Sequence, residues 1–129
     1  MSNELNELKI VILQTPDRRL GLNRSRYQHW GVTARLTREL YHEASVAVLV
    51  ALTGRTWVPV KEAVVNVAVY NGARSMDRDN TISCLKAAFD ALQGRVIVND
   101  AGLHIGSVEW RRDSGWRRTV LTVMPVLAH

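Results

Sequence analysis

The chain has 129 residues, which is enough for one domain with its own core, since 47% of them are hydrophobic. Cys84 is the only cysteine, which excludes an intramolecular disulfide and suits a reducing cytoplasm. The first residues lack the basic and then apolar pattern of a signal peptide, and the longest apolar stretch, residues 44–52, is too short to span a membrane. We therefore expect a cytoplasmic protein that does not bind membranes.

The charge of the chain is strongly positive. The formal net charge is +5 with a pI near 10.0, and all but three of the 17 basic residues are arginines. A guanidinium group matches the oxygens of a phosphate, so this excess favours a polyanionic partner such as nucleic acid. The alternative is a solubilising surface charge.

The first third of the chain predicts a strand, a loop and a long helix. Residues 8–13 are an apolar run typical of a buried strand, and residues 14–27 are polar and arginine-rich, as in an exposed loop. Residues 28–52 repeat apolar side chains every three or four positions, which predicts a helix that ends at Gly54.

The middle of the chain predicts a central strand followed by a second helix. Residues 57–70 are rich in β-branched side chains and apolar on both faces, which indicates a strand covered on both sides. Asn71 and Gly72 end it. Residues 80–93 have a helical apolar repeat that Gly94 terminates.

The last third predicts further strands. Residues 96–98 form a short apolar run, and residues 104–111 and 116–126 are two strands that residues 113–115 (Asp-Ser-Gly) would join as a hairpin. The expected fold class is α/β, with one domain over residues 1–129, a mixed β-sheet, two main helices and the order β-α-β-α-β-β.

Acidic residues are few, yet four of them, Asp77, Asp79, Asp90 and Asp100, lie within 24 positions. Asp77 and Asp79 stand two apart between the central strand and the second helix, and side chains two apart in an extended chain point the same way. Two carboxylates so placed suit Mg²⁺, which takes one or two of them and keeps several waters. The alternative is that Asp77 to Asn80 form only a helix N-cap and a turn.

Lys86 follows Asp79 by seven residues, which is two turns of a continuous helix. Helical side chains lean toward the N-terminus, so the ammonium group would be carried back toward the aspartates. Asp90 lies at i, i+4 from Lys86, and the alternative is a solvated surface pair. Asp100 ends the short run at residues 96–98, which could return to the same sheet edge, although an ordinary turn residue is the alternative.

In combination, these segments resemble the signature of the RusA-type Holliday junction resolvases, which are crossover junction endodeoxyribonucleases. The matching segments are Asp-Arg-Asp-Asn at 77–80, Leu-Lys-Ala-Ala-Phe-Asp-Ala-Leu at 85–92 and Val-Asn-Asp at 98–100. The strong part of the likeness covers residues 74–112. Two positions depart from the pattern: Asn99 stands where an acidic residue is frequent, and Lys86 lies about one turn further from the aspartates.

The resemblance implies a RusA-like homodimer that resolves four-way DNA junctions by paired symmetric nicks in recombination and repair. It implies metal ligands at Asp77, Asp79 and Asp100, which with Lys86 form the catalytic set, and secondary roles for Asn80 and Asp90. The reaction would be phosphodiester hydrolysis with Mg²⁺, for which Mn²⁺ could substitute, without a small-molecule cofactor. A two-fold dimer would present two sites to the two-fold symmetric junction.

Expected DNA contacts come from the arginine-rich loop and from the two arginines that flank the aspartates: Arg18, Arg19, Asn23, Arg24, Arg26, Arg74 and Arg78. The arginines around the expected hairpin turn, Arg111, Arg112, Arg117 and Arg118, are either further phosphate contacts or surface charge. Three alternatives remain open. These are a nuclease of the same fold that acts on other branched DNA, a catalytically inactive junction-binding module, and a basic α/β interaction protein.

Overall fold

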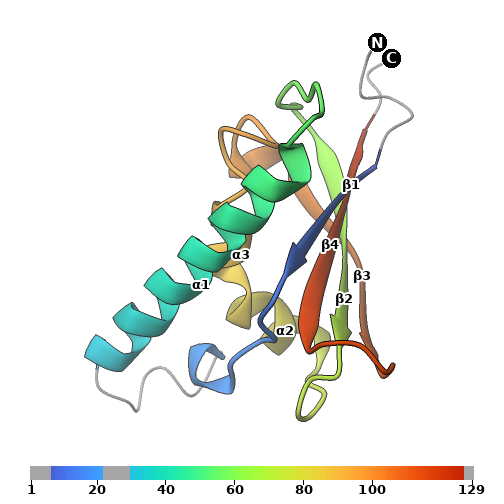
Figure 1. Ribbon diagram of the computed structural model, residues 1–129. Helices are drawn as coiled ribbons and strands as arrows, with labels where there is room; N and C mark the ends of the chain where they lie inside the picture. The colour runs from blue at the N-terminus through green and yellow to red at the C-terminus, as the bar shows by residue number, and fades with distance from the viewer. Residues whose placement is uncertain (1–6, 22–29, 127–129) are drawn as a thin grey trace.

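The computed structural model describes residues 7–21 and 30–126, and four strands form its single mixed sheet in the order β1-β4-β2-β3 (Figure 1). β2 runs parallel to β3 and antiparallel to β4, and β1 runs antiparallel to β4. The elements are β1 (Leu8–Ile12), η1 (Arg18–Leu20), α1 (Trp30–Leu52), β2 (Ala63–Tyr70), α2 (Arg78–Cys84), α3 (Lys86–Asp90), η3 (Asp100–Gly102), β3 (Leu103–Arg111) and β4 (Arg118–Pro125). The predicted α/β class and mixed sheet are confirmed.

The helices cover one face of the sheet, and the core lies between the two layers (Figure 1). Every second residue of β2 is buried there, beginning with Ala63, while Val64 and its successors on the other face are only half-buried. The prediction that this strand is covered on both sides is therefore wrong for a single chain. The apolar repeat of α1 is buried at Leu36, Leu40, Ala44 and Ala47, and Arg35 pairs with Glu39 at 3.3 Å on the exposed side.

The segment that joins β3 to β4 is not a hairpin, contrary to the prediction, because β2 lies between these two strands. The turn crosses over the end of β2, where Asn71 adopts a positive φ of 60°. The Asn71 side chain donates to the Asp113 carboxylate at 2.8 Å and to the Gly115 carbonyl at 3.0 Å. Arg118 also donates to Asp113, at 2.7 Å, and packs over the Tyr70 ring.

The predicted second helix is two helices. α2 ends at Cys84 and α3 begins at Lys86, because Leu85 leaves helical geometry with φ −103° and ψ 8°. The apolar repeat runs through this break unchanged, so periodicity gives no sign of it. The predicted strand at residues 96–98 is also wrong: Ile97 makes only isolated bridges, to Val60 and Gln93.

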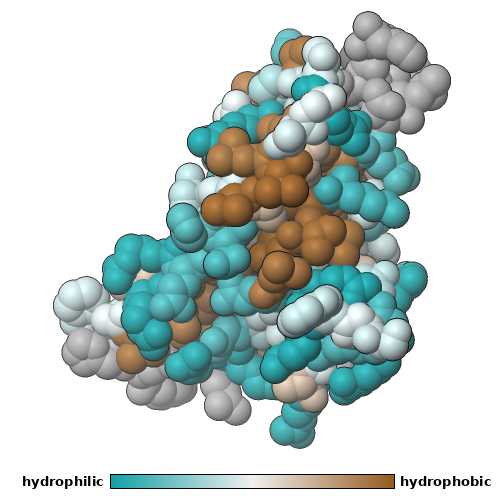
Figure 2. All heavy atoms as spheres, in the orientation of Figure 1, coloured by the Kyte–Doolittle hydropathy of each residue, from teal (hydrophilic) through white to brown (hydrophobic). Residues whose placement is uncertain are grey.

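Cys84 is fully buried, and burial raises the pKa of its thiol to about 11. No helix in the described ranges is long and apolar enough to cross a membrane. The surface is not uniformly polar, however, because a patch of apolar side chains lies over α1 and β1 (Figure 2).

Candidate functional site

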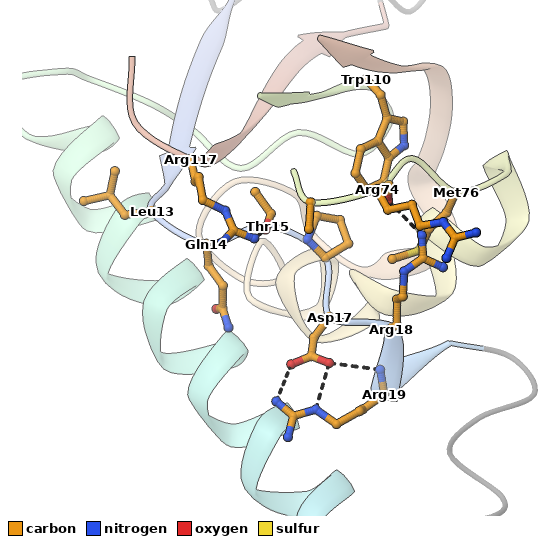
Figure 3. A pocket seen from close by; sticks show the side chains of 12 residues that line it. Leu13, Gln14, Thr15, Asp17, Arg18, Arg19, Arg74, Met76, Trp110 and Arg117 are labelled. Atoms are coloured by element: carbon orange, nitrogen blue, oxygen red, sulfur yellow. Dashed lines mark hydrogen bonds and ion pairs between the residues drawn. The ribbon is translucent and has the colours of Figure 1, made fainter. Parts of the chain in front are cut away.

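A pocket of about 600 Å³ opens at the end of the sheet where β1, β2 and β3 finish and β4 begins. Three segments far apart in the sequence meet there: residues 13–19, residues 73–76 and Arg117, with Trp110 of β3 as a wall (Figure 3). Four arginines line the pocket, Arg18, Arg19, Arg74 and Arg117, against one carboxylate. This excess of guanidinium groups suits an anionic ligand.

The single carboxylate, Asp17, already forms an ion pair with Arg19. Arg19 donates to it from Nη2 at 2.8 Å, from Nε at 3.1 Å and from its backbone N–H at 2.9 Å. These hydrogen bonds, the side-chain one foremost, hold the pKa of Asp17 below its usual value. The pair consumes one positive charge, so the net charge of the lining comes from the other three arginines.

Arg18 ties the first loop to the segment after β2. Its Nη2 donates to the backbone carbonyls of Arg74 at 2.9 Å and Ser75 at 3.2 Å. The carbonyls orient the guanidinium without cancelling its charge. Arg117 enters from the opposite side of the pocket and donates to Thr15 Oγ1 at 3.2 Å (Figure 3). No acidic partner of Arg74 occurs in the described part of the chain.

Trp110 connects the pocket with the aspartate turn. Its indole N–H donates to Thr81 Oγ1 at 3.2 Å, and this hydroxyl donates to the Asp77 carbonyl at 2.8 Å. The ring also lies directly on Gly72, where a Cβ atom would come within 2.5 Å of Trp110 Cζ3. Any residue with a Cβ atom at position 72 would therefore displace the Trp110 ring that lines the pocket.

The amide oxygen of Gln14 is the one polar side-chain atom, among those of residues 7–21 and 30–126, that is buried without a hydrogen-bond partner. A buried acceptor left without a donor costs free energy, so a bound group or water with a donor would satisfy it. Gln14 lines the same pocket.

Asp77 directly follows Met76, which lines this pocket, and Asp79 is the second residue of α2. Asp77 is the N-cap: its Oδ1 accepts from the backbone N–H of Asn80 at 2.8 Å, and its Oδ2 lies 3.4 Å from Asn80 Nδ2. Asp79 is exposed in the first helical turn. The prediction that Asp77 and Asp79 lie in extended chain, with side chains that point the same way, is therefore wrong, because helical geometry begins at Arg78 and residues two apart in a helix do not face each other. The capping alternative is thus correct for Asp77, although a capping carboxylate keeps further lone pairs.

Asp100 is not brought to the other two aspartates. Because β2 and β3 are parallel and Ala63 pairs with Leu103, η3 stands at the end of the sheet opposite to the start of α2 (Figure 1). The length of β2, about 26 Å at 3.3 Å per residue, separates the two ends. Asn99 accepts from the Ala101 N–H at 3.0 Å and caps η3.

Lys86 and Arg78 also point elsewhere. Lys86 is exposed on α3, with its Nζ 3.7 Å from Asp90 Oδ2, which is the predicted surface pair. The Arg78 guanidinium donates to the backbone carbonyls of Ile105, at 2.9 Å, and Gly106 of β3. Arg78 therefore holds the start of α2 onto the edge strand.

Of the predicted DNA contacts, the structure gathers Arg18, Arg19 and Arg74, while Asn23, Arg24 and Arg26 lie outside the described residues. Trp110 was missed, because nothing in the sequence marks an aromatic residue of β3 as a neighbour of residues 14–19. For Arg117 the sequence does not distinguish a phosphate contact from a surface charge, and the structure places it in the pocket lining.

Across the described ranges, no three His, Cys, Asp or Glu side chains lie together as a metal site would need. Asp77 and Asp79 can supply one or two oxygen ligands, which is the number Mg²⁺ takes from a protein.

Comparisons of the chain with protein-family models, with curated proteins and with solved structures find no match.

Proposed function

We propose that this protein binds branched DNA in the arginine-lined pocket and cuts it at Asp77 and Asp79 as a metal-dependent, junction-selective endonuclease of the RusA type. The observation that carries the proposal is that hydrogen bonds connect the arginine-lined pocket with the turn that holds Asp77. Arg18 bonds the segment that leads into Asp77, and Trp110 is bonded to the same turn through Thr81. A DNA strand held by the arginines would pass beside both carboxylates.

Each residue has a defined task in this proposal. Arg74 and Arg117 would grip two phosphates from opposite sides of the pocket, and Arg18 would orient a third contact. Trp110 offers an aromatic face for an unpaired base near the junction centre. Mg²⁺ at Asp77 and Asp79 would polarise the scissile phosphate and lower the pKa of a bound water, and Mn²⁺ could take its place.

A second candidate is a DNA-binding module without catalysis. The observation that favours it is the separation of Asp100 from Asp77 and Asp79, together with the exposed position of Lys86. In that case the arginine pocket would still bind DNA, but the aspartates would only begin a helix.

The experiment that decides between them uses a synthetic four-way junction, a linear duplex and a flap, each with Mg²⁺ or with EDTA. The proposal expects paired symmetric nicks in the junction with Mg²⁺ alone. Binding of the junction without nicks under any metal condition selects the non-catalytic module. Equal cutting of the linear duplex, or cutting that survives EDTA, rejects the junction-selective, metal-dependent enzyme.

A further inference from the structure

Trp116 has the most exposed large apolar side chain in the described part of the chain, with 82% of it open to solvent. It lies in the turn between β3 and β4, at the end of the sheet where the arginine-lined pocket opens (Figure 1). A single exposed apolar side chain is common on protein surfaces and marks no site by itself. Two further properties of the turn, its rigidity and its charge, distinguish Trp116.

Hydrogen bonds hold the turn in place on both sides of Trp116. Arg118 donates from Nη1 to the Trp116 carbonyl at 2.8 Å and from Nη2 to Asp113 at 2.7 Å. Asp113 also accepts from the backbone N–H of Gly115 at 2.9 Å and from the Asn71 amide at 2.8 Å. The backbone at Trp116 is thus restrained before any ligand binds, so a ligand that covers the ring orders little of the protein.

Arginine residues flank Trp116 in the same turn. Arg117, the next residue, lines the pocket, and Arg112 is exposed four residues earlier. Neither guanidinium forms an ion pair with any residue that the structure describes. An exposed indole ring between two such cations suits a ligand that combines flat aromatic faces with negative charge. A nucleic-acid strand has both, in its bases and its phosphates.

We propose that Trp116 stacks on a base of an unpaired DNA strand whose phosphates contact Arg112 and Arg117. Within a duplex the neighbouring bases cover both faces of each base, so a base must be unpaired to stack on the indole ring. Trp116 is not part of the pocket lining, so this subsite is additional to Trp110. The single strand would continue from the pocket across the turn.

This proposal rests on the DNA binding proposed above but not on cleavage. It defines the substrate class more closely, as branched DNA that carries an unpaired single strand, such as a flap or a splayed arm. An acidic protein is the competing partner for the two arginines, but it lacks the regular series of flat faces that a single strand offers to a tryptophan.

The first test is the binding of a short oligothymidylate to the full chain in EDTA, measured by fluorescence anisotropy. Trp116→Ala should weaken binding by about five-fold or more, the lower end of what one stacked base contributes. Trp116→Phe should retain most of the affinity, because a smaller ring still stacks. Tyr41→Ala is the matched control, since Tyr41 is 49% exposed on α1, outside the turn and the pocket lining, and it should bind as the wild type does.

The second test separates stacking from charge. Trp116→Ala should leave the affinity for a linear duplex unchanged, and it should not alter the salt dependence of single-strand binding, because it removes no phosphate contact. Arg112→Ala should instead make the slope of log K against log salt shallower by about 0.7 for the single strand. Both variants should keep the circular dichroism spectrum of the wild type, because both side chains are exposed.

Unchanged binding of the oligothymidylate by Trp116→Ala overturns the inference and leaves the exposed ring to a protein partner. An equal loss of affinity for the duplex, or an equal loss in Tyr41→Ala, overturns it as well. A wild type that binds the four-way junction while Trp116→Ala has no effect on single strands refutes this inference alone. A wild type that binds no DNA of any kind refutes the proposed function with it.

Discussion

Arg18 and Arg74, which are 56 residues apart in sequence, are joined by a hydrogen bond of 2.9 Å from the guanidinium of the first to the backbone carbonyl of the second. This bond leaves the side chain of Arg74 available, and both arginines line the same pocket. Like charges placed together in this way repel, and a bound phosphate relieves the repulsion.

Removal of Arg74 should weaken DNA binding without altering the fold. Arg74→Ala deletes one phosphate contact, so the slope of log K against log salt should become shallower by about one. Arg117→Ala should have the same effect. Fluorescence anisotropy across a salt series measures both. Arg95→Ala is the control, since Arg95 is exposed near the opposite end of the sheet, and an equal loss there would show a non-specific charge effect instead.

Two substitutions of Asp77 should distinguish its role as a helix N-cap from its proposed role as a metal ligand. Asp77→Ala removes the N-cap of α2 and should cost about 1 kcal/mol of unfolding free energy. Asp77→Asn keeps a good capping side chain, so the unfolding free energy should hardly change while Mg²⁺-dependent cleavage falls. Chemical denaturation and the junction assay provide the two readouts. Full cleavage by the asparagine variant would remove Asp77 from the proposed metal ligands.

Gly72 should tolerate no side chain. A Cβ atom there would lie 2.5 Å from the Trp110 ring and 3.2 Å from Val69 Cγ1, so Gly72→Ala must displace the wall of the pocket. Overpacking of this kind costs about 1–3 kcal/mol. Denaturant unfolding measures the loss, and Ala73→Ser on the exposed neighbour should change it by no more than about 0.5 kcal/mol. An unchanged stability for Gly72→Ala would mean that Trp110 moves freely.

The turn that crosses the end of β2 should make the free energy of unfolding depend on pH in the acidic range, through Asp113. Hydrogen bonds from Arg118, Gly115 and Asn71 hold the pKa of Asp113 well below its usual range. Because the folded-state pKa is the lower one, the stabilisation is complete above the unfolded value of about 3.9 and is lost as the pH falls further. The melting temperature of the wild type should therefore decline more steeply below that pH than that of Asp113→Asn. Parallel curves would contradict the assignment.

Local periodicity was enough to predict β1, α1, β2 and the two last strands, because each has a clear apolar repeat in the sequence. The predicted start of the central strand at residue 57 is wrong, since β2 begins at Ala63. It could not reveal which strands are neighbours. The Asp-Ser-Gly turn looks like a hairpin, and only the long-range bonds of Asn71 with Asp113 and Gly115 explain why β2 separates the strands it joins. The break at Leu85 is equally invisible, since its side chain still fits the buried stripe.

The candidate site was also predictable only in part, because a local sequence pattern does not show which segments meet in space. Asp77 and Asp79 are two residues apart and had to be close in space, but only the structure shows that Asp79 already lies in a helical turn. Of the described residues of the arginine-rich loop, Arg19 is exposed while residues 14–18 are half-buried, so the prediction of an exposed loop holds there only in part. Asp100 depended on the direction of β3, and parallel pairing with β2 carries it to the opposite end of the sheet. The pocket itself arises where three chain segments converge, so Trp110 could be assigned to it only once the fold was known.

The most direct measurement of the central claim is the cleavage of a labelled four-way junction by wild-type protein and by Asp79→Asn in the presence of Mg²⁺. Asp79 is exposed and does not cap the helix, so its removal should leave the fold and junction binding intact. The proposal predicts paired nicks by the wild type and by the control Asp90→Asn, and none by Asp79→Asn. Undiminished nicking by Asp79→Asn, or no nicking by the wild type, would contradict it.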